Sequence, residues 1–153
     1  MKKVIAVLFL GLVLQVNSQT EISKHYDKIG KFKNGIAIVQ SRGLFGAINT
    51  EGKEVIKPEW DRLSGFGEDG IAYARKNGLV GLITKDGTVL AEPVYNRIGT
   101  FTNGKAVVLK NGLKGIMEIS GKVVIEPKYD NLKIEEGGLI RAQINGQEVL
   151  LKL

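Results

Sequence analysis

The sequence lacks the residues on which cysteine and histidine chemistry depends. Its 153 residues contain no cysteine and one histidine, His25. Disulfides, thiol nucleophiles and cysteine-ligated metals are therefore excluded, and one histidine makes no metal cluster. Nothing in the sequence supports a Ser-His-Asp arrangement around His25, which we interpret as a solvated side chain. We expect no catalytic residue, no metal site and no cofactor.

Proline is also scarce, whereas glycine is abundant. There are 3 prolines and 20 glycines, with 43% hydrophobic and 25% charged residues. This composition is typical of a globular chain with many tight turns between short strands. No stretch after residue 18 shows a sustained helical period, so the sequence predicts an all-β fold with almost no helix.

Long apolar runs are absent except at the N-terminus. Lys2 and Lys3 precede the apolar residues 4–16, and Val16 and Ser18 suit the −3 and −1 positions of a cleavage site. The run is shorter than the roughly 20 residues of a membrane-spanning helix, although an uncleaved anchor is the alternative. We interpret residues 1–18 as a secretory signal peptide. The chain is then expected to be periplasmic, cell-surface or secreted, with no stable membrane span after cleavage.

The net charge is small when residues 1–18 are left out. The whole chain has 22 basic and 16 acidic residues, and without Lys2 and Lys3 the balance is 20 against 16, or +4. The two signs are interspersed, which favours a solvated surface over a dedicated anionic partner. Since an exported protein seldom meets nucleic acid, we expect no nucleic-acid partner.

An internal repeat is the strongest pattern in the chain. An aromatic residue followed by Asp or Asn recurs at Tyr26, Trp60, Tyr95 and Tyr129, with spacings of 34, 35 and 34 residues. Units of this length bury their apolar face by stacking on their neighbours. After a lead-in at 19–25, the domain at 26–153 therefore comprises the units 26–59, 60–94, 95–128 and 129–153.

Glycines keep the same register within these units. The first column is Gly35, Gly70, Gly104 and Gly138; the second is Gly43, Gly78, Gly112 and Gly146; the third is Gly46, Gly81 and Gly115; the fourth is Gly52, Gly87 and Gly121. The second column follows Asn or Arg between apolar runs, which predicts type I′ hairpin turns, and the fourth marks another tight turn. The third lies inside a strand, where glycine indicates a bulge or a close backbone approach.

Each of the three full units also has one proline, at Pro58, Pro93 and Pro127. Because proline has no N–H for a strand ladder, we expect it at an edge or corner where it ends the third strand, with a short fourth strand beyond it. The last unit lacks the fourth glycine and the proline, and has Val149 in the third column. We therefore predict an open twisted array of antiparallel β-meanders, three full units plus a truncated capping unit, and not a closed propeller.

These columns resemble the WG-repeat (KWG-repeat) family. The segment GIAIVQSRGLFGAINTEGKEVIKPEWDRLSGF carries nearly the whole family pattern, and the resemblance extends over residues 26–153. Such proteins are largely bacterial, often exported and mostly uncharacterised, so the resemblance implies an architecture more than an activity. The namesake tryptophan is replaced by Phe45, Val80 and Lys114, which argues against a regular tryptophan ladder.

Two columns are candidate sites. The Asp27, Asp61, Asn96 and Asp130 column includes an asparagine, which keeps a turn hydrogen bond but cannot transfer a proton, so an Asx-type turn role is favoured. The aromatic rings of Tyr26, Trp60, Tyr95 and Tyr129 would bind sugars or protein if they faced solvent, but packing inward is favoured on a strict structural period. Gln40, Arg75, Lys76 and Arg141 would then lie on the outer face.

The sequence thus favours an exported, non-catalytic repeat module that binds or scaffolds an unknown protein or glycan at the cell envelope. A structural envelope component without a dedicated ligand is the alternative. An enzyme is the weakest of the three hypotheses, since it would need a cleft with a strongly perturbed carboxylate unique to one unit.

Overall fold

The computed structural model describes residues 25–152. The expected signal peptide and nearly all of the lead-in lie outside the described residues. The described chain is built of β-strands and one 3-10 turn, η1 (Glu136–Gly138). It divides into two compact units with the boundary between Leu63 and Ser64, and each is described by itself.

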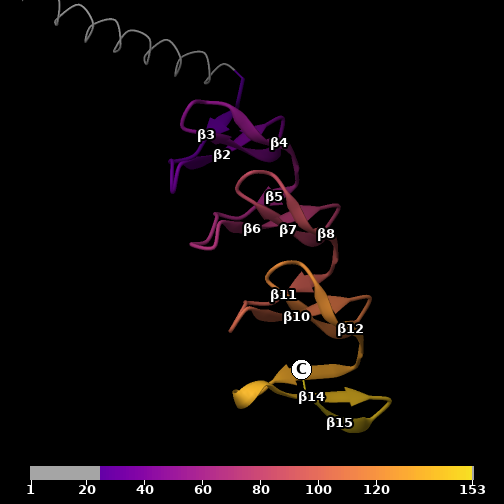
Figure 1. The fold of residues 1–153 in the computed structure, drawn as a ribbon. Coiled ribbons are helices and arrows are strands. Elements are labelled where there is room, and N and C mark those ends of the chain that lie inside the picture. Colours follow the sequence, from indigo (N-terminus) through magenta and orange to yellow (C-terminus); the bar gives the residue numbers. More distant parts are fainter. Residues whose placement is uncertain (1–24, 153) are drawn as a thin grey trace, which may run out of the picture. The chain divides into compact units, whose positions relative to one another are not determined.

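The first unit contains one complete meander (Figure 1). Its strands β1 (Lys28–Ile29), β2 (Ile36–Ser41), β3 (Leu44–Asn49) and β4 (Glu54–Trp60) pair in sequence order, and β5 (Arg62–Leu63) follows β4. We call the sheet of β1 to β4 sheet 1. Ala37, Val39 and Ile48 form its buried cluster, and the ring of Tyr26 packs against that cluster.

The second unit contains three further groups of strands. Of the strands in the second unit, β6 (Ile71–Lys76), β7 (Leu79–Thr84) and β8 (Val89–Tyr95) belong to sheet 2. Sheet 3 is formed by β9 (Arg97–Ile98), β10 (Lys105–Lys110), β11 (Leu113–Glu118) and β12 (Val123–Tyr129), and sheet 4 by β13 (Asn131–Ile134), β14 (Leu139–Ile144) and β15 (Gln147–Lys152). Neighbouring strands are antiparallel, and the strand order in each sheet is linear. The all-β meander repeats and the truncated last unit are therefore confirmed.

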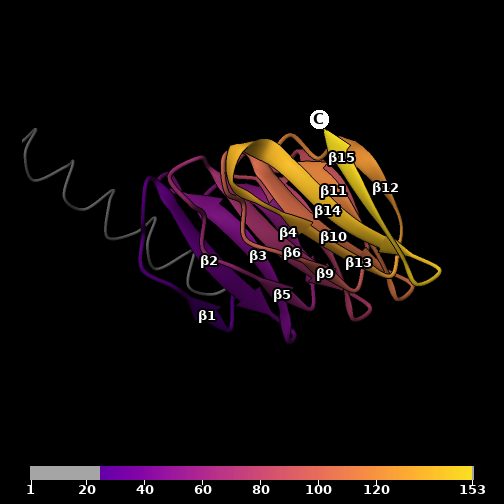
Figure 2. The ribbon, with the colours of Figure 1, turned by 90° about the horizontal axis from the view of Figure 1, so that it is seen from below.

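The sheets of the second unit are stacked on one another (Figure 2). Between sheets 2 and 3 lies one core, made of Val80, Leu82, Ala91, Tyr95, Ile98, Ala106, Val108 and Met117. Between sheets 3 and 4 lies another, made of Ile116, Tyr129, Leu132, Ile140 and Ala142. Since these apolar side chains come from both members of each pair, neither sheet could bury its face alone.

Two kinds of turn connect the strands. Gly43, Gly78, Gly112 and Gly146 have φ of 83°, 79°, 82° and 76°, and the Arg or Asn before each also has positive φ, as a type I′ turn requires. Gly52, Gly87 and Gly121 have φ of 79°, 92° and 88°. Each donates its N–H to a carbonyl three residues earlier, for instance Gly87 to Thr84 at 3.0 Å.

The proline does not end the third strand, and that prediction is wrong. Pro58, Pro93 and Pro127 lie inside β4, β8 and β12, which continue to the aromatic residue. These are edge strands of their sheets, so no neighbouring strand needs the missing N–H. The short strands β5, β9 and β13 begin after the aromatic-Asp/Asn pair, so each structural unit starts slightly later than the sequence repeat indicates.

A bulge accommodates each proline. Val80 pairs with Tyr95 and Leu82 with Ala91, so β7 advances by two residues while β8 advances by four. The extra backbone presses on Gly81, where an added Cβ would lie 2.9 Å from the nitrogen of Pro93 and closer still to the carbonyl oxygen of Ala91. Gly46 and Gly115 face the same backbone segment in sheets 1 and 3. Glycine is thus required by space in the middle strand.

We predict that Gly81→Ala destabilises the fold by about 1 to 3 kcal/mol or more, because its methyl group overlaps backbone that cannot move aside. The matched control is Gly65→Ala, where an added Cβ meets nothing within 4 Å, and it should change the free energy of unfolding by less than about 0.5 kcal/mol. Urea unfolding measures both. Equal stability of the two variants would contradict the steric account.

Candidate interaction surface

The aromatic column is largely buried. Trp60, Tyr95 and Tyr129 are 4%, 7% and 6% exposed, and the rings of Tyr95 and Tyr129 lie in the two cores of the second unit. Tyr26 is half-buried. Its hydroxyl donates to Glu54 at 3.4 Å, and burial, followed by the Glu54 carboxylate, raises the pKa of this tyrosine. Three of the four candidate rings therefore offer no face to a sugar or a protein.

Three members of the Asp/Asn column accept a hydrogen bond from a residue much farther along the chain than a local Asx turn reaches. Asp27 accepts a hydrogen bond from the backbone N–H of Arg42 at 2.6 Å, Asn96 from Asn111 at 2.8 Å and Asp130 from Asn145 at 2.7 Å. Each donor is the first residue of a type I′ turn, fifteen positions downstream. The side chain fixes the hairpin tip to the start of its own sheet, a role that Asn96 fills as well as Asp.

Carboxylates with a lowered pKa lie on the surface. The Thr84 hydroxyl donates to Asp86 and lowers the pKa of that carboxyl group, and Arg141 does the same for Glu135. Both shifts favour the charged form, the opposite of what a general acid needs at neutral pH. Within residues 25–152 no cluster of three or more His, Asp or Glu could hold a metal ion, and no helix is long and apolar enough to cross a membrane.

One face of sheet 4 is exposed, whereas sheets 2 and 3 bury the equivalent face. By strand alternation, the side chains of Lys133, Leu139, Arg141, Gln143, Glu148, Leu150 and Lys152 point to one side, opposite the core residues Ile140 and Ala142; we call this side the terminal face. Leu150 is 58% exposed, whereas its repeat equivalents Leu82 and Ile116 are 1% and 0% exposed. The terminal face is thus the stacking face of the last sheet.

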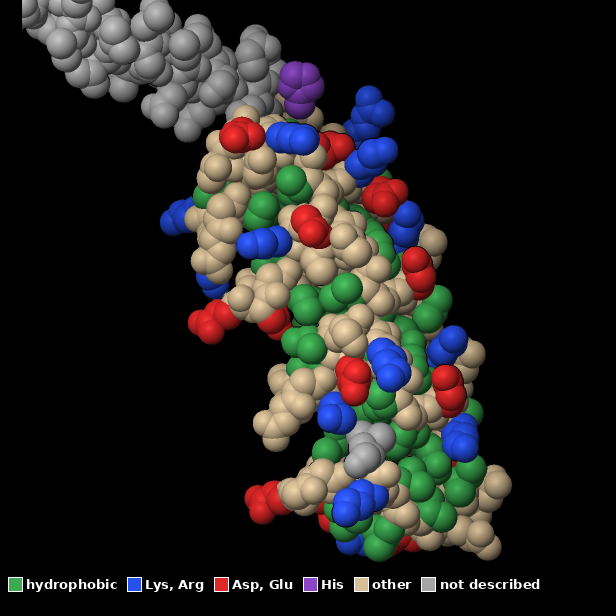
Figure 3. All heavy atoms as spheres, viewed as in Figure 1, with side chains coloured by type: hydrophobic (Ala, Val, Ile, Leu, Met, Phe, Trp, Pro, Cys, Tyr) green, Lys and Arg blue, Asp and Glu red, His purple; other side chains and the backbone are tan. Residues whose placement is uncertain are grey.

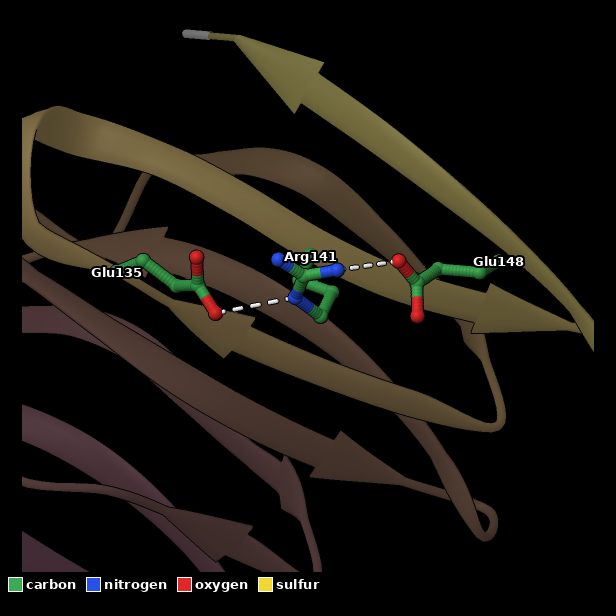
Figure 4. Close-up of polar contacts among 3 residues, drawn as sticks. All are labelled: Glu135, Arg141 and Glu148. Atoms are coloured by element: carbon green, nitrogen blue, oxygen red, sulfur yellow. Dashed lines mark hydrogen bonds and ion pairs between the residues drawn. The ribbon is translucent and has the colours of Figure 1, made fainter.

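A charged triad replaces the apolar stacking residue on this face (Figure 4). Arg141 stands at the repeat position of Tyr73 and Val107, which pack toward the next sheet. Its Nε lies 3.1 Å from Glu135 Oε1, and its Nη1 contacts Glu148 Oε1. The exposed position of Arg141 follows from the sequence pattern, but its two ion pairs do not, because Glu135 lies in an irregular segment beside η1.

Tyr73 is a residue that sequence reasoning missed. Its hydroxyl donates to the carbonyl oxygen of Gly99 at 2.9 Å, which ties sheet 2 to the segment before β10, and burial raises its pKa. Its ring lies 6.5 Å from that of Phe101. The only signal was an aromatic residue at an alternate position of β6 in one unit.

The second unit also contains an open groove between β10 and the β13–η1 segment, with a volume of about 580 Å³. Its polar lining is Thr100, Thr102, Asn103, Lys105, Lys133, Glu135, Glu136 and Lys152, and its apolar lining includes Val107, Leu132 and Ile134. Both signs of charge are present, as on the surface drawn in Figure 3, where Lys/Arg and Asp/Glu side chains are interspersed. We call it the Lys/Glu groove.

A second hollow lies in the first unit, with a volume of about 710 Å³. It is lined by His25, Tyr26, Ser41, Arg42, Leu44, Gly52, Glu54 and Pro58. Leu44 is 37% exposed, and the nearby β1 segment carries Ile29 at 37% and Phe32 at 46%. This end of sheet 1 therefore exposes more apolar surface than a complete stacking contact would leave.

Stacked antiparallel meanders, each with a glycine facing a bulged proline strand, define a β-repeat module. The chain belongs to the family of the WG containing repeat, whose model matches residues 19–45, 45–79, 81–113 and 115–147. The first match begins inside the lead-in, seven residues before Tyr26. This family membership confirms the resemblance drawn from the repeat columns.

No curated protein matches the chain significantly. Among solved structures, it is similar to KlHsv2 with loop 6CD replaced by a Gly-Ser linker, at 14% sequence identity and a TM-score of 0.40. The match covers 82% of this chain and 50% of the other, so the chain spans about half the length of that structure.

We predict that the Asp column acts through its hydrogen bond and not through its charge. Asp130→Ala should destabilise the protein by about 1 kcal/mol and speed exchange of the Asn145 amide proton, because it removes the acceptor. Asp130→Asn should be nearly neutral, since Asn96 fills the equivalent place. Hydrogen exchange with urea unfolding measures both effects. Equal losses in the two variants would show that the charge is needed.

Proposed function

We propose that this chain is an exported, non-catalytic repeat module that binds or scaffolds a protein or glycan at the cell envelope. Membership of a repeat family supports the module, and the N-terminal pattern supports export. The Lys/Glu groove carries the binding part of the proposal, because it combines an apolar floor with hydrogen-bond donors and acceptors of both charges.

The lining of this groove favours a protein segment over a glycan. Sugar binding commonly uses an exposed aromatic ring as a stacking surface. The groove is lined by no aromatic residue, and Tyr95 and Tyr129 of the second unit are buried. A peptide with both acidic and basic side chains would instead pair with Lys105 on one side and with Glu136 on the other.

The alternative is a structural envelope component without a dedicated ligand. The mixed charges of the described surface fit it equally well, since they keep a protein soluble without a partner. Tight, saturable binding of one ligand to the purified chain would argue against this alternative.

A phage-displayed library of random peptides, with a glycan array beside it, tests the proposal. We expect enriched peptides of mixed charge whose affinity falls at least tenfold with Lys105→Glu, because charge reversal removes their acidic contacts. Lys122→Glu is the matched control, an exposed lysine outside the groove lining, and should leave binding unchanged. Absence of any enriched peptide, or equal binding by both variants, would refute the groove as the site.

A further inference from the structure

Among the described residues, sheet 4 has no counterpart of the long strand that borders sheets 1, 2 and 3. Those sheets end in β4, β8 and β12, each paired with the middle strand of its hairpin. Among the described residues, β15 holds the same position as those middle strands but pairs with β14 only. One side of β15 therefore presents unpaired backbone groups, which is the arrangement that accepts an added strand.

A segment in the register of that missing strand precedes the first sheet. Counted back from the aromatic residue, residues 20–26 correspond to β4, β8 and β12. Ile22 takes the place of Ile56, Ala91 and Ile125, and Tyr26 that of the aromatic residue. The family model independently includes this segment, since its first match begins at residue 19.

The segment and β15 depart from the repeat pattern in a complementary way. In the three complete sheets, a glycine in the middle strand faces the bulge at the proline. In β15 the glycine is replaced by Val149, whose side chain leaves no space for such a bulge. In the N-terminal segment the proline is replaced by Lys24, so no bulge is required. Val149 can therefore lie opposite a strand without a bulge, whereas a bulged strand needs a glycine opposite the bulge.

The position of Tyr26 agrees with this assignment. Its ring packs against Ala37, Val39 and Ile48 of sheet 1. Tyr95, which ends β8, packs in the same way against the equivalent residues Ala106, Val108 and Met117 of sheet 3. Tyr26 thus contacts sheet 1 in the way that Tyr95 contacts sheet 3. Among the described residues, however, Tyr26 does not end a strand of another sheet.

We propose that residues 20–26 of one copy of this chain pair with β15 of a second copy and complete its sheet 4. Val80 pairs with Tyr95 in sheet 2, and their equivalents are Glu148 and Tyr26. A flat antiparallel register from that pair sets Lys24 opposite Leu150 and Ile22 opposite Lys152. Sheet 4 of one copy then lies before sheet 1 of the next, which covers Leu150 and the apolar residues around Tyr26.

The charges on the terminal face are compatible with this contact. Arg141 is already paired with Glu135 and Glu148, so covering the face leaves no unpaired charge among these three. Lys133 and Lys152 are exposed at the margin, where their amino groups stay in water. Lys24 of the added strand shares the side of Leu150, at the column of Pro58, Pro93 and Pro127, which is only partly buried, so its amino group also reaches water. On the facing surface the charged groups are His25, Arg42 and Glu54, and the Glu54 carboxylate accepts from Tyr26.

Sedimentation of the chain expressed from its full sequence tests the association. We expect concentration-dependent dimers and longer assemblies that are lost with Ile22→Lys, because a like charge then lies opposite Lys152 in place of the apolar side chain. Ser23→Lys is the matched control, since its equivalents Lys57, Glu92 and Glu126 are charged and exposed, and it should still associate. Circular dichroism verifies that both variants fold. A monomer at all concentrations, or equal behaviour of the two variants, would overturn the proposal.

The absence of cysteine allows a direct test of the register. Chains carrying Lys24→Cys and, separately, Leu150→Cys are mixed under mild oxidation, and we expect a disulfide-linked heterodimer, because directly opposed strand positions suit a disulfide. Lys24→Cys mixed with Lys128→Cys, on the exposed side of β12, should give none. A disulfide formed within single chains of the Lys24→Cys/Leu150→Cys double variant, without heterodimers from the mixture, would contradict pairing between copies. Neither test depends on the Lys/Glu groove having a ligand.

Discussion

In each complete sheet, the backbone just before a proline lies directly against a glycine in the neighbouring strand. The extra residues of β4, β8 and β12 form a bulge there, and an added Cβ on Gly46, Gly81 or Gly115 would lie 2.7 to 2.9 Å from the proline nitrogen. This contact lets the strand turn while it stays paired, and in the second unit the final aromatic residues of β8 and β12 reach the next sheet. The glycine and the proline are therefore one structural feature, although they are twelve positions apart in the sequence.

The stacking of the second unit follows from this feature. Tyr95 and Tyr129 end the bulged strands and enter the cores that join successive sheets. Where the glycine is lost, at Val149, sheet 4 has three strands and its stacking face carries Arg141 between two glutamates. The surfaces proposed above as binding sites are those at which the repeat is interrupted. They are the terminal face, the edge of β15 and the Lys/Glu groove beside η1.

Much of this fold is predictable from local sequence. Asn-Gly pairs specify type I′ turns, and short alternating runs specify strands, because both depend on neighbouring residues. The path of the strand through Pro58 was mispredicted because the bulge that lets β4 continue past the proline depends on its pairing with β3 at Gly46. The hydrogen bond from Asn145 to Asp130 and the ion pair of Arg141 with Glu135 were equally hidden. Asp130, Asn145 and Glu135 lie in turns and connecting segments outside the strands, where the strand pattern specifies no geometry.

The central claim is that a glycine and a bulged proline strand are in direct contact in every complete sheet. Nuclear Overhauser spectroscopy of the folded protein tests it without any substitution. The account predicts cross-peaks between the Hα protons of Gly81 and the Hδ protons of Pro93, and between those of Gly115 and Pro127. If these cross-peaks are missing while those of the hairpins at Asn77-Gly78 and Asn111-Gly112 are present, the contact does not exist and the account is wrong.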